Sequence, residues 1–291
     1  MLDNRKKLIP PCSYQGGKQR LSSQIVDIIY KQNNINDETK FYDLCCGSGA
    51  ISIEIINRGF NGSNITMVDA SPWGLFYKGV GDLTFSPDVF KMYIDDIPKD
   101  ITKIKSYAKE MLNRQANDGL FENMVYKFLI LQACAFGSTA IWVENNKWRQ
   151  GGLIDYWLPT ETSNRKSPVN PMMPMPKTLF DRVESICANM DNVNGIYGMV
   201  EDVKVEDGSI VYLDPPYKDT YGYGYNLDYS MYIKNMLENT NGVTIYLSEG
   251  FPVEGAKESI LLSKGRKKGN VKGNIKKKPT EEWLNIFTNI K

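Results

Sequence analysis

Ile210-Val-Tyr-Leu-Asp-Pro-Pro-Tyr217 is the stretch of sequence from which the fold can be worked out. Its apolar, β-branched start predicts a buried strand. The strand must end at Asp214, because Pro215 and Pro216 have no N–H to donate to a neighbouring strand. Open α/β sheets bind their ligands at the carboxyl ends of strands. A carboxylate, the Pro215 carbonyl and the Tyr217 ring suit a planar ring that bears an amino group; the alternative is a strand that merely ends in a Pro-Pro turn.

The composition limits the class of protein. With 291 residues, of which 42% are apolar, the chain can form one large domain or one domain with a smaller insertion. The five cysteines form no C-x-x-C pair, which favours a reducing, cytoplasmic setting over a disulfide framework or a zinc site. A polar N-terminus and the lack of a run of about 18 apolar residues predict no signal peptide and no membrane span.

Histidine is absent from the chain. Its absence excludes a Ser-His-Asp triad, a histidine general base and most zinc or iron sites, so we expect no bound metal. Any chemistry must therefore proceed without a base that titrates near neutral pH.

A strand, a glycine turn and a helix are predicted from Lys40 through Ile56, and Gly47 and Gly49 allow a ligand to approach the backbone closely. Ser52 stands where the dinucleotide fingerprint needs its third glycine. A second strand, Ile65 to Asp69, ends in an acid 20 residues after Gly49, where a carboxylate can take both hydroxyls of a ribose. This pattern favours a cofactor that contains a nucleoside and needs no pyrophosphate.

Tyr14 and Lys18 lie on either side of a Gly-Gly turn, ahead of a helix predicted over Leu21 to Tyr30. An aromatic ring and a lysine at a helix start can hold a small anionic ligand. A generic turn is the alternative.

Other elements follow from the same periodicity. The remaining helices are expected at Asp95–Asn113, Asn123–Ala135, Leu179–Met190 and, as a short one, Thr280–Phe287, and the remaining strands at Gly195–Asp202 and Val243–Ser248.

Two segments have the composition of a nucleic-acid contact. The first is an extended arm within Ile141–Pro176, in which aromatic residues alternate with polar and basic ones; the contact residues expected there are Trp148, Arg149, Asn164 and Arg165. The second is a basic loop, Lys264–Lys278, with eight Lys or Arg and no acid; its expected contacts are Lys264, Arg266, Lys267 and Lys268. An arm that packs its tryptophans on the protein's own surface and a solvated basic tail are the alternatives.

Taken together, these motifs resemble the Dam-type DNA adenine-N6 methyltransferases along most of the chain. The resemblance lies in Tyr14-Gln-Gly-Gly-Lys18, in Asp43-x-x-x-Gly47-x-Gly49, in Asp69-Ala-Ser-Pro72 and in Asp214-Pro-Pro-Tyr217, in that order. The basic loop followed by Thr280–Phe287 is also similar to the family's ending. A cofactor loop ahead of an insertion and then Asp-Pro-Pro-Tyr is the alpha arrangement of amino-methyltransferases.

The resemblance implies a Rossmann-like class I methyltransferase sheet, mostly parallel with one antiparallel strand. Residues 1–75 and 177–291 would bind S-adenosylmethionine, and residues 76–176 would be an inserted, mostly helical target-recognition domain. The cofactor residues it implies are Tyr14, Lys18, Asp43, Gly47, Gly49, Asp69, Ala70, Asp202 and Asp214, with Asp214, Pro215, Pro216 and Tyr217 as the catalytic motif.

The expected activity is methylation of N6 of a flipped adenine in double-stranded DNA, by a monomer in the cytoplasm of a bacterial or phage-infected cell. Cytosine N4 enzymes more often have Ser before Pro-Pro-Tyr, and glutamine-modifying ones Asn, so Asp214 favours adenine. RNA as the substrate and a non-catalytic DNA-binding relative remain alternatives at this point.

Overall fold

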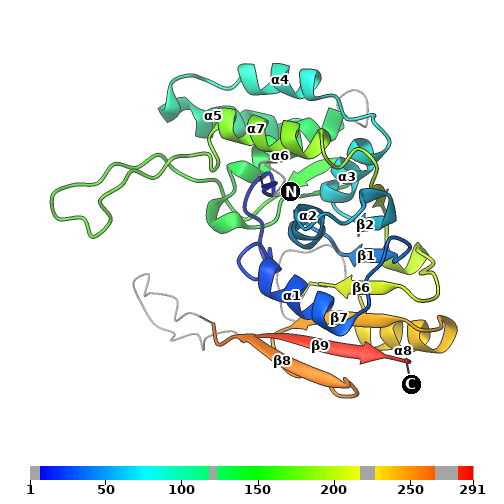
Figure 1. The fold of residues 1–291 in the computed structure, drawn as a ribbon. Helices are drawn as coiled ribbons and strands as arrows, with labels where there is room; N and C mark the ends of the chain where they lie inside the picture. Colours follow the sequence, from blue (N-terminus) through cyan, green and yellow to red (C-terminus); the bar gives the residue numbers. More distant parts are fainter. Residues whose placement is uncertain (1–6, 118–122, 217–226, 266–280, 291) are drawn as a thin grey trace.

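The computed structural model describes residues 7–117, 123–216, 227–265 and 281–290. Its centre is a seven-stranded sheet of order β5-β2-β1-β6-β7-β9-β8 (Figure 1). The strands are β1 (Phe41–Leu44), β2 (Ile65–Asp69), β5 (Asn194–Tyr197), β6 (Ile210–Leu213), β7 (Thr244–Glu249), β8 (Glu258–Ser263) and β9 (Glu282–Thr288). The five strands β5, β2, β1, β6 and β7 pair in parallel with their neighbours in that order, whereas β9 runs antiparallel to β7 and β8. The chain is therefore an α/β protein with a mostly parallel mixed sheet, compatible with a Rossmann-like fold.

The central strands are apolar because both faces of the sheet are covered. Every residue of β1 and of β6 is buried, which explains why they lack the polar alternation of a half-exposed strand. Phe41 belongs to the core on one face, and Tyr42 and Leu44 belong to the core on the other.

Helices cover these two faces. The first core receives residues of α1 (Ser22–Gln32), α2 (Ala50–Asn57) and α3 (Pro72–Gly81), and the second receives Ile233 and Met236 of α8 (Tyr229–Asn239). Pro72 at the first turn of α3 and the Ser71 side chain, which accepts from the Trp73 N–H, define where that helix begins.

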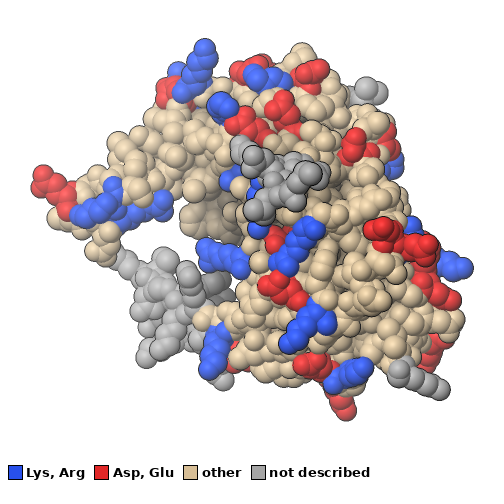
Figure 2. Space-filling model, viewed as in Figure 1, with Lys and Arg blue, Asp and Glu red and all other residues tan. Residues whose placement is uncertain are grey.

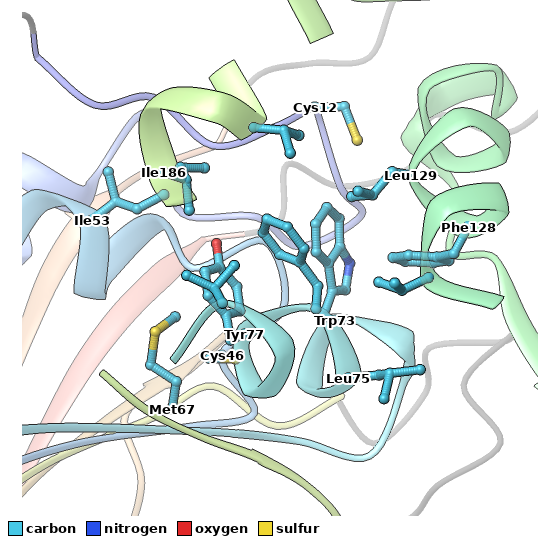
Figure 3. Close-up of a cluster of buried hydrophobic side chains, with 14 of the residues drawn as sticks. Cys12, Cys46, Ile53, Met67, Trp73, Leu75, Tyr77, Phe128, Leu129 and Ile186 are labelled. Carbon is cyan, nitrogen blue, oxygen red and sulfur yellow. The ribbon is translucent and has the colours of Figure 1, made fainter. Parts of the chain in front are cut away.

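The helix α3 lies unusually close to β5. A Cβ built on Gly195 would be 2.2 Å from the backbone of Tyr77, and one built on Gly74 would be 2.0 Å from the Asp69 carbonyl oxygen, so any side chain at either position would push the helix off the sheet. From this position α3 directs Trp73 and Tyr77 into the core (Figure 3).

A helical layer lies beyond β5, built from α4 (Pro87–Asp95), α5 (Ile104–Asn113), α6 (Met124–Ala133) and α7 (Pro176–Cys187) (Figure 1). All ten residues of α6 are buried, and its Phe128 packs edge-on against Trp73 with ring centroids 5.0 Å apart. Because of such contacts, the buried residues of this layer and of the first sheet face form one core. The helix α3 also crosses the boundary expected between residues 75 and 76. The division into two domains stays a prediction.

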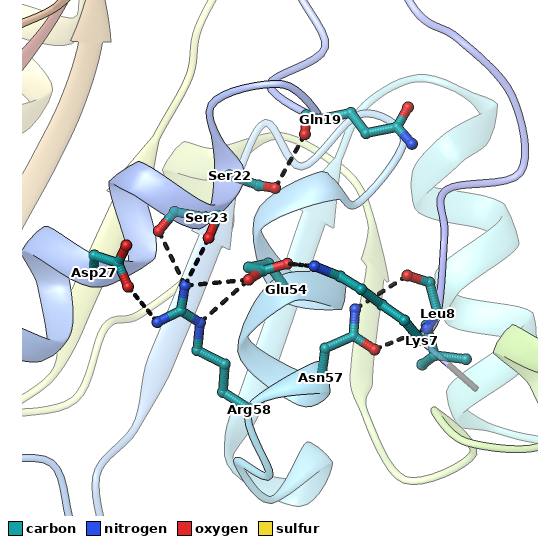
Figure 4. Close-up of polar contacts among 9 residues, drawn as sticks. All are labelled: Lys7, Leu8, Gln19, Ser22, Ser23, Asp27, Glu54, Asn57 and Arg58. Atoms are coloured by element: carbon teal, nitrogen blue, oxygen red, sulfur yellow. Dashed lines mark hydrogen bonds and ion pairs between the residues drawn. The ribbon is translucent and has the colours of Figure 1, made fainter. Parts of the chain in front are cut away.

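The N-terminal segment is fixed to α2 before it reaches the Tyr14–Lys18 turn. Asn57 bonds the backbone of Leu8 in both directions, at 2.8 and 3.0 Å, and Lys7 pairs with Glu54 at 2.9 Å (Figure 4). Arg58 joins α2 to α1 through Asp27 and Ser23.

Three expectations about secondary structure are wrong. Residues 281–287 do not form the expected helix: from Glu282 they belong to β9, whose Leu284 and Ile286 face one core while Phe287 faces the other, a period of two. The helix expected over Asp95–Asn113 is α-helical only in α5, because Asp95 ends the preceding helix α4 and Pro98 lies between the two. The strand expected to reach Asp202 ends at Tyr197, and Glu201 and Asp202 lie on a 3-10 turn, Val200–Asp202. The sequence reasoning also missed α3, α4, α8, β8 and the hairpin of β3 (Trp142–Glu144) and β4 (Lys147–Arg149).

Candidate active site

The glycine loop, Cys45–Gly49, joins β1 to α2 and is closed on two sides by tyrosines. Its tight path requires positive φ at Gly47 (49°) and Gly49 (74°). The Tyr77 hydroxyl donates to the Ser48 carbonyl at 2.6 Å. A Cβ on Gly47 would lie 3.1 Å from the Tyr14 ring, so the predicted Tyr14 turn and the predicted glycine loop are in contact.

Asp69 holds the glycine loop from the tip of β2. One carboxylate oxygen accepts from the Gly47 N–H at 2.7 Å, and the other accepts from the Ser71 N–H at 2.8 Å, across the Ala70 link. Burial raises the pKa of Asp69 above its ordinary value, against the lowering effect of these bonds. Each oxygen has a second lone pair, so Asp69 can still accept from a ligand.

Asp43 lies beneath the loop, only 1% exposed. One of its oxygens accepts from both the N–H and the hydroxyl of Ser52, at 3.2 and 2.6 Å. Burial raises the pKa of Asp43 to about 7. Its observed contacts fix the start of α2, and they explain why a serine stands where the dinucleotide fingerprint has glycine.

Asp214 follows β6 at the same edge of the sheet, where its own N–H bonds the Leu44 carbonyl of β1. The Lys18 ammonium lies 2.6 and 2.7 Å from its two carboxylate oxygens and also donates to the Gly16 carbonyl at 3.0 Å. Two residues that are 196 positions apart therefore form one ion pair. Pro215 is buried and Pro216 half-buried beside it.

Two further carboxylates complete an ion cluster, which we define as Lys18, Asp214, Glu249 and Glu282. Glu282, the first residue of β9, has an oxygen 3.5 Å from the Lys18 ammonium. Glu249, the last residue of β7, is 2% exposed, and among the described residues its Oε2 has no hydrogen-bond partner. Three carboxylates and one ammonium, all ionised, sum to −2.

The charges of this cluster act on one another. Burial raises the pKa of Asp214 to about 6, with Lys18 opposing the rise and Glu282 and Glu249 adding to it. Burial acts to lower the pKa of Lys18, but Asp214 and Glu282 outweigh it, so the pKa lies above its ordinary value. A buried site with excess negative charge is unfavourable in isolation and favours a positively charged ligand.

Asp202 follows β5, whose Tyr197 lies opposite Asp69 in the sheet. It is exposed and lines a pocket of about 440 Å³ together with Tyr42, Thr66 and Tyr197. Tyr42 belongs to the core on the α8 face of the sheet, and the residues that line the pocket include neither Asp69 nor Asp214.

Trp148 corrects the expectation of a nucleic-acid contact at that position. Its side chain is 7% exposed and packs in the core, so its ring cannot stack on a base. The neighbouring Arg149 is exposed and pairs with Glu144 at 2.9 Å across the hairpin.

The arm projects from the side of the molecule on which β6 ends (Figure 1). Trp157 and Val169 bond each other's backbone in both directions at 3.0 and 2.9 Å and so pair its two limbs. Asn164 and Arg165 are exposed near its tip, where Arg165 donates to the Ser167 carbonyl at 2.9 Å. Figure 2 shows the molecule hollowed between the arm and the body, with Lys and Arg side chains along the margin.

Some predicted residues lie outside the described part of the chain: Tyr217, Arg266, Lys267 and Lys268. Lys264, at the end of β8, is described and exposed. Sequence reasoning missed two residues of the ion cluster. Glu282 lies in a segment that was expected to be helical, and Glu249 directly follows the strand expected at Val243–Ser248.

Within residues 7–117, 123–216, 227–265 and 281–290, no group of three or more His, Cys, Asp or Glu side chains could hold a metal ion. Over the same ranges, no helix has both the length and the apolar character needed to cross a bilayer. No family model matches the chain, and no curated protein matches it.

Proposed function

We propose that this chain is an S-adenosylmethionine-dependent methyltransferase that acts on N6 of adenine in double-stranded DNA. The observation that supports this best is the Lys18–Asp214 pair at the carboxyl end of β6, beside the glycine loop that Asp69 and Tyr14 hold. The pair joins the first and the last of the motifs on which the resemblance to Dam-type enzymes is based.

The charge and the donor sets of the site suit this cofactor. S-adenosylmethionine has a positive sulfonium, an ammonium and a ribose, and when bound it supplies an electrophilic methyl group. The ion cluster has an excess of two negative charges, which favours a cation. Asp69 can accept from ribose hydroxyls with its remaining lone pairs, and Tyr14 lies over the loop at Gly47.

Asp214 and Pro215 would then act on the substrate amine. The lone pair of adenine N6 is delocalised into the ring, which makes the nitrogen a poor nucleophile. A carboxylate oxygen of Asp214 and the Pro215 carbonyl can each accept one of its N–H bonds and draw the nitrogen toward a tetrahedral geometry. Holding the amine in line with its electrophile supplies most of the acceleration. The electron pair of the broken C–S bond would stay on the sulfur, which becomes neutral. The methylated nitrogen would be briefly cationic and strongly acidic, so it would lose its proton to solvent water without a histidine base.

Double-stranded DNA is proposed as the substrate because the arm and the basic residues flank this edge of the sheet. Arg165 and Asn164 on the arm and Lys264 after β8 are exposed to solvent, as phosphate contacts must be. An adenine would have to leave the duplex to reach Asp214.

A single-turnover assay tests the proposal. The purified chain is incubated with methyl-labelled cofactor and duplex DNA, single-stranded DNA or RNA, and the product is digested to nucleosides. Label in N6-methyldeoxyadenosine from the duplex is the expected result. Label in N4-methyldeoxycytidine, or in RNA alone, would replace the proposed substrate. DNA binding without transfer of label at any pH would instead indicate a non-catalytic module.

A further inference from the structure

Glu282 lies against the ammonium that holds Asp214. Its Oε1 is 3.5 Å from Lys18 Nζ, whereas the Asp214 oxygens are at 2.6 and 2.7 Å and the Gly16 carbonyl is at 3.0 Å. An ammonium has three N–H bonds to donate, and here it has acceptors on three separate segments, the Tyr14–Lys18 turn, the end of β6 and the start of β9.

We propose that Glu282 is a positioning residue, which keeps the Lys18 ammonium fixed against Asp214 so that the Asp214 carboxylate keeps one orientation toward the substrate amine. The role of Asp214 in this statement rests on the proposed function. Glu282 is a positioning and not a catalytic residue, because its observed contact is with Lys18.

The chemistry of lysine explains why a second carboxylate is needed. A lysine side chain carries its point charge on a flexible four-carbon stem. A single partner therefore leaves the side chain free to adopt several conformations. Lys18 is 5% exposed, and its side chain cannot exchange its partners for bulk water. A second acid on β9 restricts the ammonium from another direction and leaves each Asp214 oxygen a lone pair for the substrate.

Several groups influence the ionisation of Asp214. Besides Lys18, they are Glu282 of β9 and Glu249 of β7. Asp214 in turn raises the pKa of three groups that face it, Asp43 of β1, Cys45 of the glycine loop and Tyr212 of β6. Glu282 raises the pKa of Asp214 and Lys18 lowers it. Loss of the negative charge at position 282 alone would lower the pKa of Asp214. If Glu282 fixes the Lys18 ammonium against Asp214, its loss also lets the ammonium move away and weakens the larger lowering effect of Lys18. The pKa of Asp214 should therefore rise in Glu282→Gln and rise further in Lys18→Met.

The test is a ¹³C NMR titration of aspartate side-chain carboxyls in the full-length protein, with Asp214→Asn to assign the Asp214 signal. In Glu282→Gln the midpoint for Asp214 should increase by about half a pH unit or more. Glu281→Gln is the matched control, because Glu281 is exposed, bonds Trp283 and carries the same charge one residue away. Its midpoint should equal that of the wild type.

An unchanged or lowered Asp214 midpoint in Glu282→Gln would overturn the proposal, because it would show that Lys18 stays against Asp214 without Glu282. An equal increase in Glu281→Gln would also overturn it. Lys18→Met is the second variant, and a midpoint there that fails to rise would also overturn it. If the protein transfers methyl groups, the acidic limb of its single-turnover rate should move with the NMR midpoint. If the wild type transfers none, the proposed function fails, while the titration still decides the role of Glu282.

Discussion

The glycine loop and the ion cluster lie at the same edge of the sheet but differ in how their carboxylates are satisfied. Around the glycine loop, backbone N–H groups bond both oxygens of Asp69, and Ser52 bonds Asp43 twice. In the ion cluster, Asp214 and Glu282 both pair with Lys18, and Glu249 Oε2 has no partner among the described residues. The first arrangement stabilises a backbone path, whereas the second weakens the fold and is suited to a ligand.

Asp43 and Asp214 show this difference on neighbouring strands. Both are buried enough for their pKa to rise, to about 7 and to about 6. Asp43 is 1% exposed and bonds Ser52, while the Asp214 side chain is 16% exposed and bonds a lysine from a distant segment. We expect substitutions at Asp43 to affect stability and substitutions at Asp214 to affect activity.

The largest expected effect is that of Asp214→Ala on methyl transfer. Loss of the carboxylate removes an acceptor for the substrate amine and should reduce the single-turnover rate by at least about 10³-fold. DNA affinity, measured by fluorescence anisotropy, should stay close to the wild-type value. Asp191→Ala, at an exposed acid, is the control. Turnover near the wild-type rate in Asp214→Ala would contradict the expectation that the ion cluster, unlike the glycine loop, serves activity.

Gly49→Ala should destabilise the glycine loop, and with it the folded protein. The backbone has φ of +74° there, and the new Cβ would lie 2.2 Å from the Tyr77 hydroxyl. We expect a loss of about 2–4 kcal/mol in the free energy of unfolding, measured by urea denaturation. Gly59→Ala separates the two causes, because Gly59 has φ of +87° and nothing within 4 Å of a new Cβ. Equal losses in both variants would mean that the contact with Tyr77 contributes nothing.

The pH dependence of the unfolding free energy should reveal the titration of Asp43. Its folded pKa of about 7 lies above the ordinary value of 3.8, so the folded protein binds the extra proton between these values and loses stability as the pH rises through them. Asp43→Asn cannot titrate, and its oxygen can still accept both bonds from Ser52. Between about pH 5 and about pH 8 the variant should lose less unfolding free energy than the wild type. Equal losses would show that Asp43 does not titrate in this range.

The smallest expected effect concerns the arm. Arg165→Ala should reduce the slope of log affinity against log salt concentration for duplex DNA by about one, because it removes one phosphate contact. Lys177→Ala, which removes an exposed lysine paired with Asp181 on α7, is the matched control and should leave the slope unchanged. If both variants behave alike, the arm does not bind DNA through Arg165.

Local sequence patterns predicted much of the parallel part of the sheet and the glycine loop. The β6 strand and its end at Asp214 follow from an apolar run and two prolines, and Gly47 and Gly49 mark a turn that only glycine adopts readily. The pairing of Lys18 with Asp214 could not be predicted in this way, because it depends on how the N-terminal turn packs across the sheet.

The errors have a similar origin. Glu281 and Glu282 ahead of an apolar run are typical of a helix start, yet pairing with β7 and β8 makes the segment a strand. Trp148 lies among aromatic and basic residues, as a ring that stacks on bases would, but tertiary packing buries it. In both cases long-range contacts outweighed a correct local preference.

The position of β9 between β7 and β8 sets an order of assembly during synthesis. Among the described strands β8 pairs only with β9, so β8 has none of them to join until the ribosome has released residues beyond Thr288. Glu282 belongs to β9, so it can join the ion cluster only after β9 is synthesised, more than 260 residues after Lys18. A nascent chain therefore has its glycine loop and Asp214 long before the ion cluster is complete.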